Sequence, residues 1–457
     1  MQRQLRILLI AVGLFQPVAL TQSRNNPTRE HWVSTWATAQ PLAATTTLSG
    51  GRRGPAPPQQ ASPSQGKPDP TQPQTPQPAQ KGGGRGNGQQ ANVPPSLNDQ
   101  TIRMVVHTSI GGRRVRVQLS NAAAATELTI GSAHIAVRAK ESAIVPGTDR
   151  ALTFSGRPTC TIRPGVLMFS DPVDLEVAPL SDLAVSVYVP KDTGPPTNHN
   201  LGLHTAYISK GDTTGQQVMP EPSTTRAYLW LSSVDVVAAP NAFAIATLGD
   251  SITDGQGTTL DANLTWPAIL ARRLAANKAT ANIAVVNVGV AGNQVLRDLA
   301  GVSALARFDR DVLSRPGVRW MILLEGINDL NLHGQSSDPD PLTSDDLIAG
   351  YRQLIDRAHT YGIQVVGATI MPEEGARLAS ERVDEIRRSV NQWIRTSHAF
   401  DAVVDFDAVV RDPDRPIRLR AEFDPGDHIH VTDTGNQAMA DAFDLAIFKV
   451  AGTALAR

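Results

Sequence analysis

Beyond residue 240, apolar runs alternate with segments whose apolar residues recur at helical spacing. The apolar runs, interpreted as buried strands, are 242–248, 283–288, 319–324, 363–370 and 402–406. The segments with helical spacing are 265–276, 303–314, 344–361, 381–398 and 434–450. Strands that alternate with helices in this way predict a doubly wound α/β fold, in which helices cover both faces of a parallel five-stranded sheet.

The preceding part of the chain, from 101 to about 237, shows short alternating strands separated by turn residues. The candidate strands are 103–108, 114–120, 151–154, 173–177 and 183–189. Gly111 and Gly112, between the first two of these strands, predict a hairpin. Short strands with turns between them predict an antiparallel β-sandwich, to which we also assign residues 32–37.

A segment of low complexity interrupts this β-sandwich. Residues 50–95 consist largely of Pro, Gln and Gly and contain almost no apolar side chains. Such a segment cannot compensate for the entropy lost on ordering, so we predict a disordered insertion. The predicted domains are therefore a β-sandwich at 30–240, which contains the insertion at 50–95, and an α/β domain at 241–457.

The first residues have the pattern of a targeting signal. Arg3 and Arg6 precede an apolar run at 7–15, which is too short to cross a hydrocarbon layer of about 30 Å. This pattern predicts a signal peptide at 1–23 and a secreted or periplasmic protein, with no membrane span after cleavage. The alternative is a leader that is kept as an anchor.

Charge and cysteine content exclude several classes of protein. The 457 residues include 42 Lys and Arg and 43 Asp and Glu, which gives a formal net charge of -1. This balance offers no basic face for a phosphate backbone, so no nucleic-acid partner is expected. The single cysteine, Cys160, excludes an intramolecular disulfide and a thiolate metal cluster.

The loops after the predicted strands of the α/β domain carry the candidate chemistry, because ligands of such sheets bind at the carboxyl ends of the strands. The first of these loops contains Ser251, preceded by Gly249 and Asp250. A serine here could be a nucleophile, or it could simply cap the following helix. The loop has neither a Gly-x-Ser-x-Gly elbow nor a Gly-Lys-Ser/Thr phosphate loop.

The second and third loops contain candidate hydrogen-bond donors. Gly292 follows the second strand, and Asn328 follows the third. Together with the Ser251 N–H, the Gly292 N–H and the Asn328 side-chain amide could stabilise the oxyanion of an acyl-transfer reaction. Taken singly, a glycine or an asparagine at such a position more often serves turn geometry than catalysis.

Near the C-terminus, Asp427 and His430 lie three residues apart. A serine nucleophile needs a histidine base, and the base needs an orienting carboxylate. The rival pairing joins His428 to Asp424, four residues earlier. Two histidines with flanking aspartates could instead bind a metal, but no further cluster completes a coordination shell, so no metal is expected.

Taken together, these motifs resemble the four signature blocks of the GDSL, or SGNH, hydrolase superfamily. The blocks are 249–251, Gly292, 326–329 and 427–430, in the expected order. The resemblance implies a flavodoxin-like fold in which Ser251 is the nucleophile and Asp427 and His430 form the acid–base pair. It also implies an oxyanion hole made by Ser251, Gly292 and Asn328, and no cofactor.

The first half of the chain carries a second resemblance. Residues 32–37, 106–112 and 119–121 are similar to the sandwich region of a secreted branch of arylesterases and acylhydrolases, some of which are associated with plant cell-wall degradation. The sequence departs from that branch in the insertion at 50–95 and in Val431, where many relatives have proline.

The expected function is therefore that of a secreted serine esterase. Its expected substrate is a small-molecule or polysaccharide ester. Acetyl or other short acyl esters of carbohydrate are the first choice. Lipid or aryl esters are the enzymatic alternative. The alternative from another class is a carbohydrate-binding protein with an inactive hydrolase scaffold, although every catalytic side-chain type is present.

Overall fold

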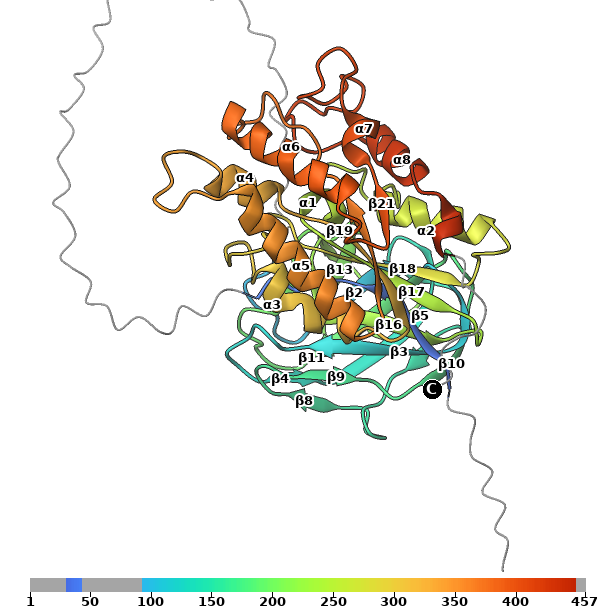
Figure 1. Cartoon of the computed structure of the whole chain (residues 1–457). Helices are drawn as coiled ribbons and strands as arrows, with labels where there is room; N and C mark the ends of the chain where they lie inside the picture. The colour runs from blue at the N-terminus through green and yellow to red at the C-terminus, as the bar shows by residue number, and fades with distance from the viewer. Residues whose placement is uncertain (1–29, 43–92, 449–457) are drawn as a thin grey trace, which may run out of the picture. The chain divides into compact units, whose positions relative to one another are not determined.

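The structure is a computed structural model, and it describes residues 30–42 and 93–448. The predicted signal peptide at 1–23 lies outside the described residues, as does the predicted insertion at 50–95 except for its last three residues. From His31 on, the chain forms one compact unit. Its antiparallel sheets come from residues before 240, and its parallel sheet comes from residues after 240 (Figure 1).

Parallel strands form the sheet of the second half. Within 93–448, they are β17 (Phe243–Gly249), β18 (Ile283–Gly289), β19 (Val318–Leu324), β20 (Gln364–Ala368) and β21 (Ala402–Val404). Their order, β18-β17-β19-β20-β21, is that of a flavodoxin-like sheet and confirms the predicted five-stranded parallel sheet. Gly249 pairs with Gly289 on one side and with Leu324 on the other, so these three strands end at the same level.

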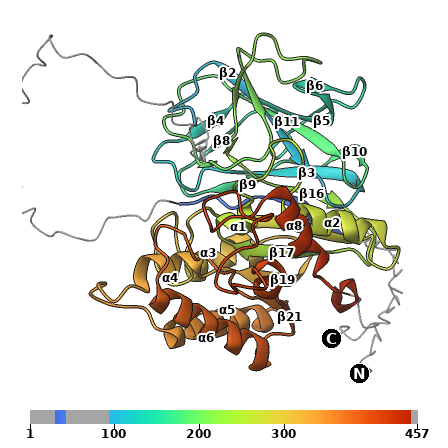
Figure 2. The same cartoon turned by 90° about the horizontal axis from the view of Figure 1, so that it is seen from above.

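Helices connect the parallel strands and cover the sheet. The described helices are α1 (Ser251–Asp254), α2 (Trp266–Ala276), α3 (Ala304–Phe308), α4 (Ile327–His333), α5 (Ser344–Thr360), α6 (Glu381–Thr396), α7 (Phe406–Val410) and α8 (Asp433–Asp441). A π-helical turn, η1 (Asp309–Leu313), continues α3, and a 3-10 turn, η2 (Leu445–Phe448), follows α8. Figure 2 shows α2 and α8 on one side of the strands and α5 and α6 on the other. None of the described helices is long and apolar enough to span a membrane.

The helix predicted at 434–450 is wrong in its second half. Helix α8 ends at Asp441, and Phe443 then stacks on Trp266 and meets Phe406 edge to face. Burying this ring among other aromatic rings stabilises the bent chain. The chain continues as η2, and residues 449 and 450 lie outside the described part.

Residues before 240 form antiparallel sheets, as predicted. Among the described residues, one sheet contains β1 (Trp32–Ala37), β3 (Gly112–Ser120), β9 (Leu167–Phe169), β10 (Val173–Val177) and β16 (Leu231–Val237). A second sheet contains β2 (Gln100–His107), β5 (Ser132–Lys140), β6 (Ala143–Ile144), β7 (Arg150–Ala151), β11 (Asp182–Val189), β13 (Ala206–Lys210) and β14 (Ser223–Thr225). Short pairs are formed by β4 (Leu128–Ile130) with β8 (Cys160–Ile162), and by β12 (Asn198–His199) with β15 (Tyr228–Leu229). Buried side chains of both large sheets, such as Val117 and Val185, belong to one hydrophobic core.

The hairpin predicted at Gly111 and Gly112 does not form. Strand β2 pairs with β11 and β13, whereas β3 pairs with β16, β10 and β9, so the two strands lie in different sheets. Close approach explains the glycines instead, because a Cβ on Gly111 would lie 2.4 Å from the Val177 carbonyl oxygen. A Cβ on Gly112 would lie 2.6 Å from the Val237 carbonyl oxygen. The strand predicted at 151–154 is also too long, since β7 ends at its first residue.

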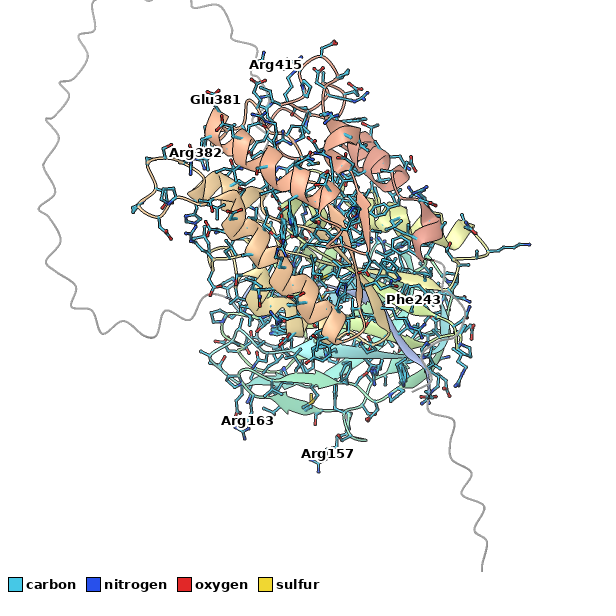
Figure 3. The ribbon with its side chains drawn as sticks, in the orientation of Figure 1. Arg157, Arg163, Phe243, Glu381, Arg382 and Arg415 are labelled. Carbon is cyan, nitrogen blue, oxygen red and sulfur yellow. The ribbon has the colours of Figure 1, made fainter. Side chains whose placement is uncertain are left out.

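The antiparallel sheets pack against the edge of the parallel sheet formed by β18. The Ser109 hydroxyl accepts a hydrogen bond from the Val285 N–H at 3.1 Å. Arg315, which follows η1 and is 4% exposed, donates to the Gln118 side chain at 3.0 Å. Figure 3 shows Arg157 pointing outward from the side of the antiparallel sheets that faces away from this junction. The two halves are therefore joined by buried polar contacts as well as by apolar packing.

Candidate active site

Ser251 stands at the carboxyl end of β17, where the strand turns into helix α1. Asp250 caps this helix by accepting a hydrogen bond from the Ile252 N–H at 2.9 Å. Gly249 permits the turn, because a Cβ there would lie 2.4 Å from the Leu324 carbonyl oxygen. Ser251 itself is 6% exposed. The backbone on both sides therefore holds its hydroxyl at the edge of the sheet.

A chain of hydrogen bonds joins Ser251 to His430 and Asp427. The His430 Nε2 lies 2.8 Å from the Ser251 Oγ, and the His430 Nδ1 lies 2.7 Å from the Asp427 Oδ2. Because a carboxylate only accepts hydrogen bonds, Nδ1 carries the proton of the neutral ring. Nε2 is then free to accept the serine hydroxyl proton. The arrangement is that of a serine with a base and an orienting acid.

The surroundings of Asp427 keep its carboxylate ionised. Burial raises the pKa of Asp427, but the hydrogen bond and charge of His430 lower it by more, with help from the N–H groups of Ile429 and His430. The net result is a pKa well below the usual range of an aspartate. The carboxylate can therefore orient the imidazole throughout the neutral pH range.

The rival pair also forms, but its histidine does not bond the serine. The His428 Nδ1 lies 2.5 Å from the Asp424 Oδ2. The His428 side chain is 42% exposed, whereas that of His430 is 11% exposed. His428 also has a left-handed φ of 65°, and its ring packs against Gly375. Of the two histidines, His430 is the one within hydrogen-bond distance of Ser251.

Gly292 and Asn328 follow β18 and β19, at the same edge of the sheet as Ser251. Gly292 has a left-handed φ of 78°. The Asn328 Nδ2 donates to the Asn293 carbonyl oxygen at 2.9 Å, so one of its two amide hydrogens is used and one remains. Within residues 93–448, the N–H groups of Ser251 and Gly292 have no hydrogen-bond partner. The residues predicted as donors thus keep donor capacity at this edge.

Arg307 is a residue of this site that the sequence pattern did not single out. It lies on α3, is 1% exposed, and donates to the carbonyl oxygens of Gly249 at 2.9 Å and Val288 at 2.6 Å. Its Nε donates to the Asn293 side chain at 2.7 Å. One guanidinium therefore joins the turn that carries Ser251 to the loop that carries Gly292. The sequence signal that could have indicated a buried Arg307 is Asp311, a residue of opposite charge four positions later, with which it pairs inside the protein.

Buried carboxyl groups of Asp250, Glu325 and Asp329 lie behind the site. Burial is the main cause that raises the pKa of Asp250 to about 7 and the pKa of Asp329 to about 6. Burial, with the nearby charge of Asp250, raises the pKa of Glu325 well above its usual value. Among the described residues, neither Glu325 carboxyl oxygen has a hydrogen-bond partner, and the distance of 3.6 Å to the Arg307 Nη2 is too long for one. The folded state therefore favours the protonated form of Glu325.

Replacing Glu325 by glutamine is expected to stabilise the protein increasingly as the pH rises. When folding raises the pKa of a carboxyl, its contribution to stability is complete below the unfolded pKa of about 4.3 and is lost as the pH rises toward the folded value. Each pH unit in that window lowers the free energy of unfolding by at most about 1.4 kcal/mol. Glu325→Gln avoids this loss, so its melting temperature should move further above that of the wild type between about pH 5 and pH 8. A constant difference over this range would mean that Glu325 is ionised in the folded protein.

Residues 247–438 match the sequence profile of the GDSL-like lipase/acylhydrolase family. No curated protein matches the chain. Among solved structures, the native M. smegmatis aryl esterase is similar at 16% identity, with 44% of this chain and 96% of that chain covered and a TM-score of 0.35. A mutant acetyl-xylooligosaccharide esterase from Geobacillus Stearmophilus is similar at 21% identity, with coverage of 48% and 98% and a TM-score of 0.35. A GDSL-like lipase from Bacteroides thetaiotaomicron is similar at 18% identity, with coverage of 45% and 88% and a TM-score of 0.33.

The matched segment begins inside β17 and ends inside α8, so it contains the parallel sheet and its loops. Residues 247–438 therefore form a GDSL-like lipase/acylhydrolase domain, and this domain makes the protein an ester hydrolase. This confirms the superfamily resemblance of the sequence. The antiparallel sheets, built from residues before 240, precede the matched segment.

Proposed function

We propose that Ser251, His430 and Asp427 hydrolyse esters through an acyl-enzyme intermediate. The observation that carries this proposal is the chain of contacts from the Asp427 carboxylate through both nitrogens of His430 to the Ser251 Oγ, at 2.7 and 2.8 Å. A serine hydroxyl is a weak nucleophile unless a base takes its proton as it attacks. His430, with its Nδ1 proton held by Asp427, offers Nε2 as that base.

In the acylation step, the Ser251 Oγ attacks the carbonyl carbon of the ester while its proton moves to the His430 Nε2. The carbonyl double bond opens, and negative charge collects on the oxygen. The N–H groups of Ser251 and Gly292 and the remaining amide hydrogen of Asn328 donate to this oxyanion. As the intermediate collapses, the bond to the alcohol oxygen breaks, and His430 gives its proton to the leaving alkoxide.

In the deacylation step, water takes the place of the alcohol. His430 accepts a proton from the water as its oxygen attacks the acyl carbon, and the same donors hold the second oxyanion. Collapse releases the carboxylic acid and returns the proton to the Ser251 Oγ. Asp427 stays ionised throughout, because its pKa is held low, and its charge stabilises the imidazolium formed in each step.

The proposed substrates are acetyl or other short acyl esters on carbohydrate, and the proposed location is outside the cytoplasm. Support for both comes from the resemblance of residues 32–37 and 106–112 to a secreted branch of esterases, and from the charged and apolar pattern of residues 1–23. We also assign the antiparallel sheets to a β-sandwich domain at 30–240, followed by the catalytic domain at 241–457.

A panel of esters tests the proposed substrate class. Rates are compared on p-nitrophenyl esters of increasing acyl length, on acetylated xylan and on phospholipid vesicles. We expect the acetate to be the best aryl ester and acetate to be released from the polymer. Faster release of fatty acid from phospholipid would favour a lipase instead. Binding to the acetylated polymer with no hydrolysis of any ester would contradict the enzymatic proposal and favour a carbohydrate-binding protein.

Asn328→Ala is expected to lower kcat by ~10²–10³ with little change in KM, because the amide hydrogen not bonded to Asn293 donates to the oxyanion of the transition state. The matched control is Asn331→Ala on the same helix, since the Asn331 amide donates to the Glu373 carboxylate at 2.6 Å, away from the serine. This control should lower the melting temperature and keep kcat. If Asn328→Ala behaves like the control, Asn328 only shapes the turn after β19.

A further inference from the structure

His199, on strand β12 of the antiparallel sheets, reaches the α/β half of the molecule at Asp254. The His199 Nε2 lies 2.9 Å from the Asp254 Oδ1, and the His199 Nδ1 lies 2.6 Å from the Ala39 carbonyl oxygen. The His199 side chain is 3% exposed and the Asp254 side chain is 5% exposed. Because a carbonyl oxygen can only accept, Nδ1 must carry a proton.

A proton on the second nitrogen makes this contact an ion pair. Burial lowers the pKa of His199, but the charge and hydrogen bond of Asp254 and the Ala39 carbonyl outweigh burial, so the pKa is raised. His199 therefore donates from both ring nitrogens, and Asp254 accepts as a carboxylate. Burying two charges costs desolvation free energy, so a buried ion pair is weak support for a purely stabilising role.

The other carboxylate oxygen of Asp254 faces the loop that carries Gly292. The Asp254 Oδ2 accepts a hydrogen bond from the Ala291 N–H at 3.0 Å. Ala291 is the residue directly before Gly292, and Asp254 is the last residue of the helix that begins at Ser251. One carboxylate thus connects the helix of the proposed nucleophile to the loop of a proposed oxyanion donor.

We propose that His199 and Asp254 are positioning residues of the esterase, and that the antiparallel sheets act through His199 to orient the Asp254 carboxylate that fixes the Ala291 and Gly292 backbone. This inference rests on the proposed function, because the fixed backbone matters as part of the oxyanion hole. The other side of Gly292 is already held, since Asn293 accepts hydrogen bonds from Arg307 and Asn328. On the side before Gly292, the Val290 N–H also donates to the Gly249 carbonyl oxygen at 2.9 Å, but of the hydrogen bonds within the described residues the one to Asp254 holds Ala291, the residue next to Gly292.

The size of the effect follows from the geometry that an oxyanion hole requires. A misplacement of about 1 Å in a group that contacts the transition state can lower the rate by ~10²-fold. Loss of a direct donor lowers it by ~10²–10³. Loosening a donor that stays present should therefore lower the rate by a smaller factor, of ~10–100-fold.

The link to the loop is tested first without measuring activity. Backbone hydrogen exchange over residues 289–296, followed by mass spectrometry, reports on the Ala291 N–H. His199→Ala and Asp254→Asn are expected to raise exchange there by ~10-fold or more, as the loss of a charge-assisted hydrogen bond implies. Asp254→Asn keeps the shape of the side chain but leaves one acceptor oxygen for two donors, the His199 ring and the Ala291 N–H. This variant therefore still tests the link if His199→Ala fails to fold.

A matched control comes from a second histidine–aspartate pair in the antiparallel sheets. The His134 Nδ1 lies 2.8 Å from the Asp149 Oδ2, on β5 and the turn before β7. His134→Ala removes the same kind of contact without touching the loop of Gly292. Exchange over 289–296, kcat and KM should all stay at the wild-type level in this control.

Kinetics on a small ester then test the role in catalysis. His199→Ala and Asp254→Asn should each lower kcat by ~10–100-fold and change KM by less than about twofold, because the donor acts in the transition state. The double variant should be no slower than the slower single variant, since both changes act through one backbone segment.

Two results would overturn the inference. If hydrogen exchange over residues 289–296 is unchanged in folded Asp254→Asn, Asp254 does not fix the loop of Gly292. If exchange rises there but kcat stays at the wild-type level, the fixed loop has no role in catalysis. A failure of the proposed function looks different. If Ser251→Ala keeps full activity while the exchange result holds, the link between the sheets and the loop stands, and the catalytic roles of Ser251 and of this link both fall.

Discussion

Ser251→Ala is expected to lower kcat by ~10³-fold or more, because it removes the hydroxyl that we propose as the nucleophile. The remaining rate comes from substrate binding and from the oxyanion donors, which the substitution leaves in place. The fold should be retained, since the turn at this position is set by the Asp250 cap and by Gly249 rather than by the serine hydroxyl.

Ser303→Ala is the matched control for this experiment. Ser303 is also 6% exposed and stands at the start of a helix, α3, where its side chain makes no capping hydrogen bond. Both variants are compared with the wild type in kcat on p-nitrophenyl acetate and in melting temperature. The control should keep its kcat. A folded Ser251→Ala protein that keeps more than about a tenth of wild-type kcat would contradict the assignment of the nucleophile.

His430→Ala should be about as damaging as Ser251→Ala, with a loss of ~10³-fold or more in kcat, because the proposed nucleophile and its proposed base would act as a unit. His428→Ala provides the comparison within the same loop. It removes an imidazole that is hydrogen-bonded to its own aspartate, Asp424, and whose side chain is 42% exposed. We expect it to lower kcat by less than about tenfold.

The two histidine variants together decide which acid–base pair works in solution. Activity and melting temperature are measured for both, so that a loss of fold is not mistaken for a loss of base. A larger loss of kcat in folded His428→Ala than in folded His430→Ala would show that Asp424 and His428 form the working pair. The loop at 424–430 would then present His428, rather than His430, to Ser251.

The edge of the parallel sheet could be predicted from the sequence because its pattern is local. Apolar runs alternate with helical spacing after residue 240, and parallel strands bring their carboxyl ends to one edge. That reasoning brought Ser251, Gly292 and Asn328 to one edge, which is where the structure has them. It could not choose between the two aspartate–histidine pairs, since both pairs form, and the distance to Ser251 distinguishes them.

Contacts between residues far apart in the chain could not be predicted in the same way. The glycines at 111 and 112 have the composition of a hairpin, yet they carry the chain from one sheet to another, because close backbone packing requires glycine there too. His199 lies 55 residues before Asp254, in a short strand with no periodic pattern around it. In the sequence, Arg307 is one polar position of a predicted helix. Its role follows from the carbonyl oxygens of Val288 and Gly249, to which it donates and which lie elsewhere in the chain.

Covalent labelling tests the central claim most directly. The protein is treated with a serine-reactive p-nitrophenyl phosphonate, and the site of the adduct is located by peptide mass spectrometry. We expect a single phosphonyl group on Ser251, no labelling of Ser251→Ala, and slow labelling of His430→Ala, where the base is missing. Labelling of another serine, in a Ser251→Ala protein that still hydrolyses esters, would contradict the assignment of Ser251 as the nucleophile.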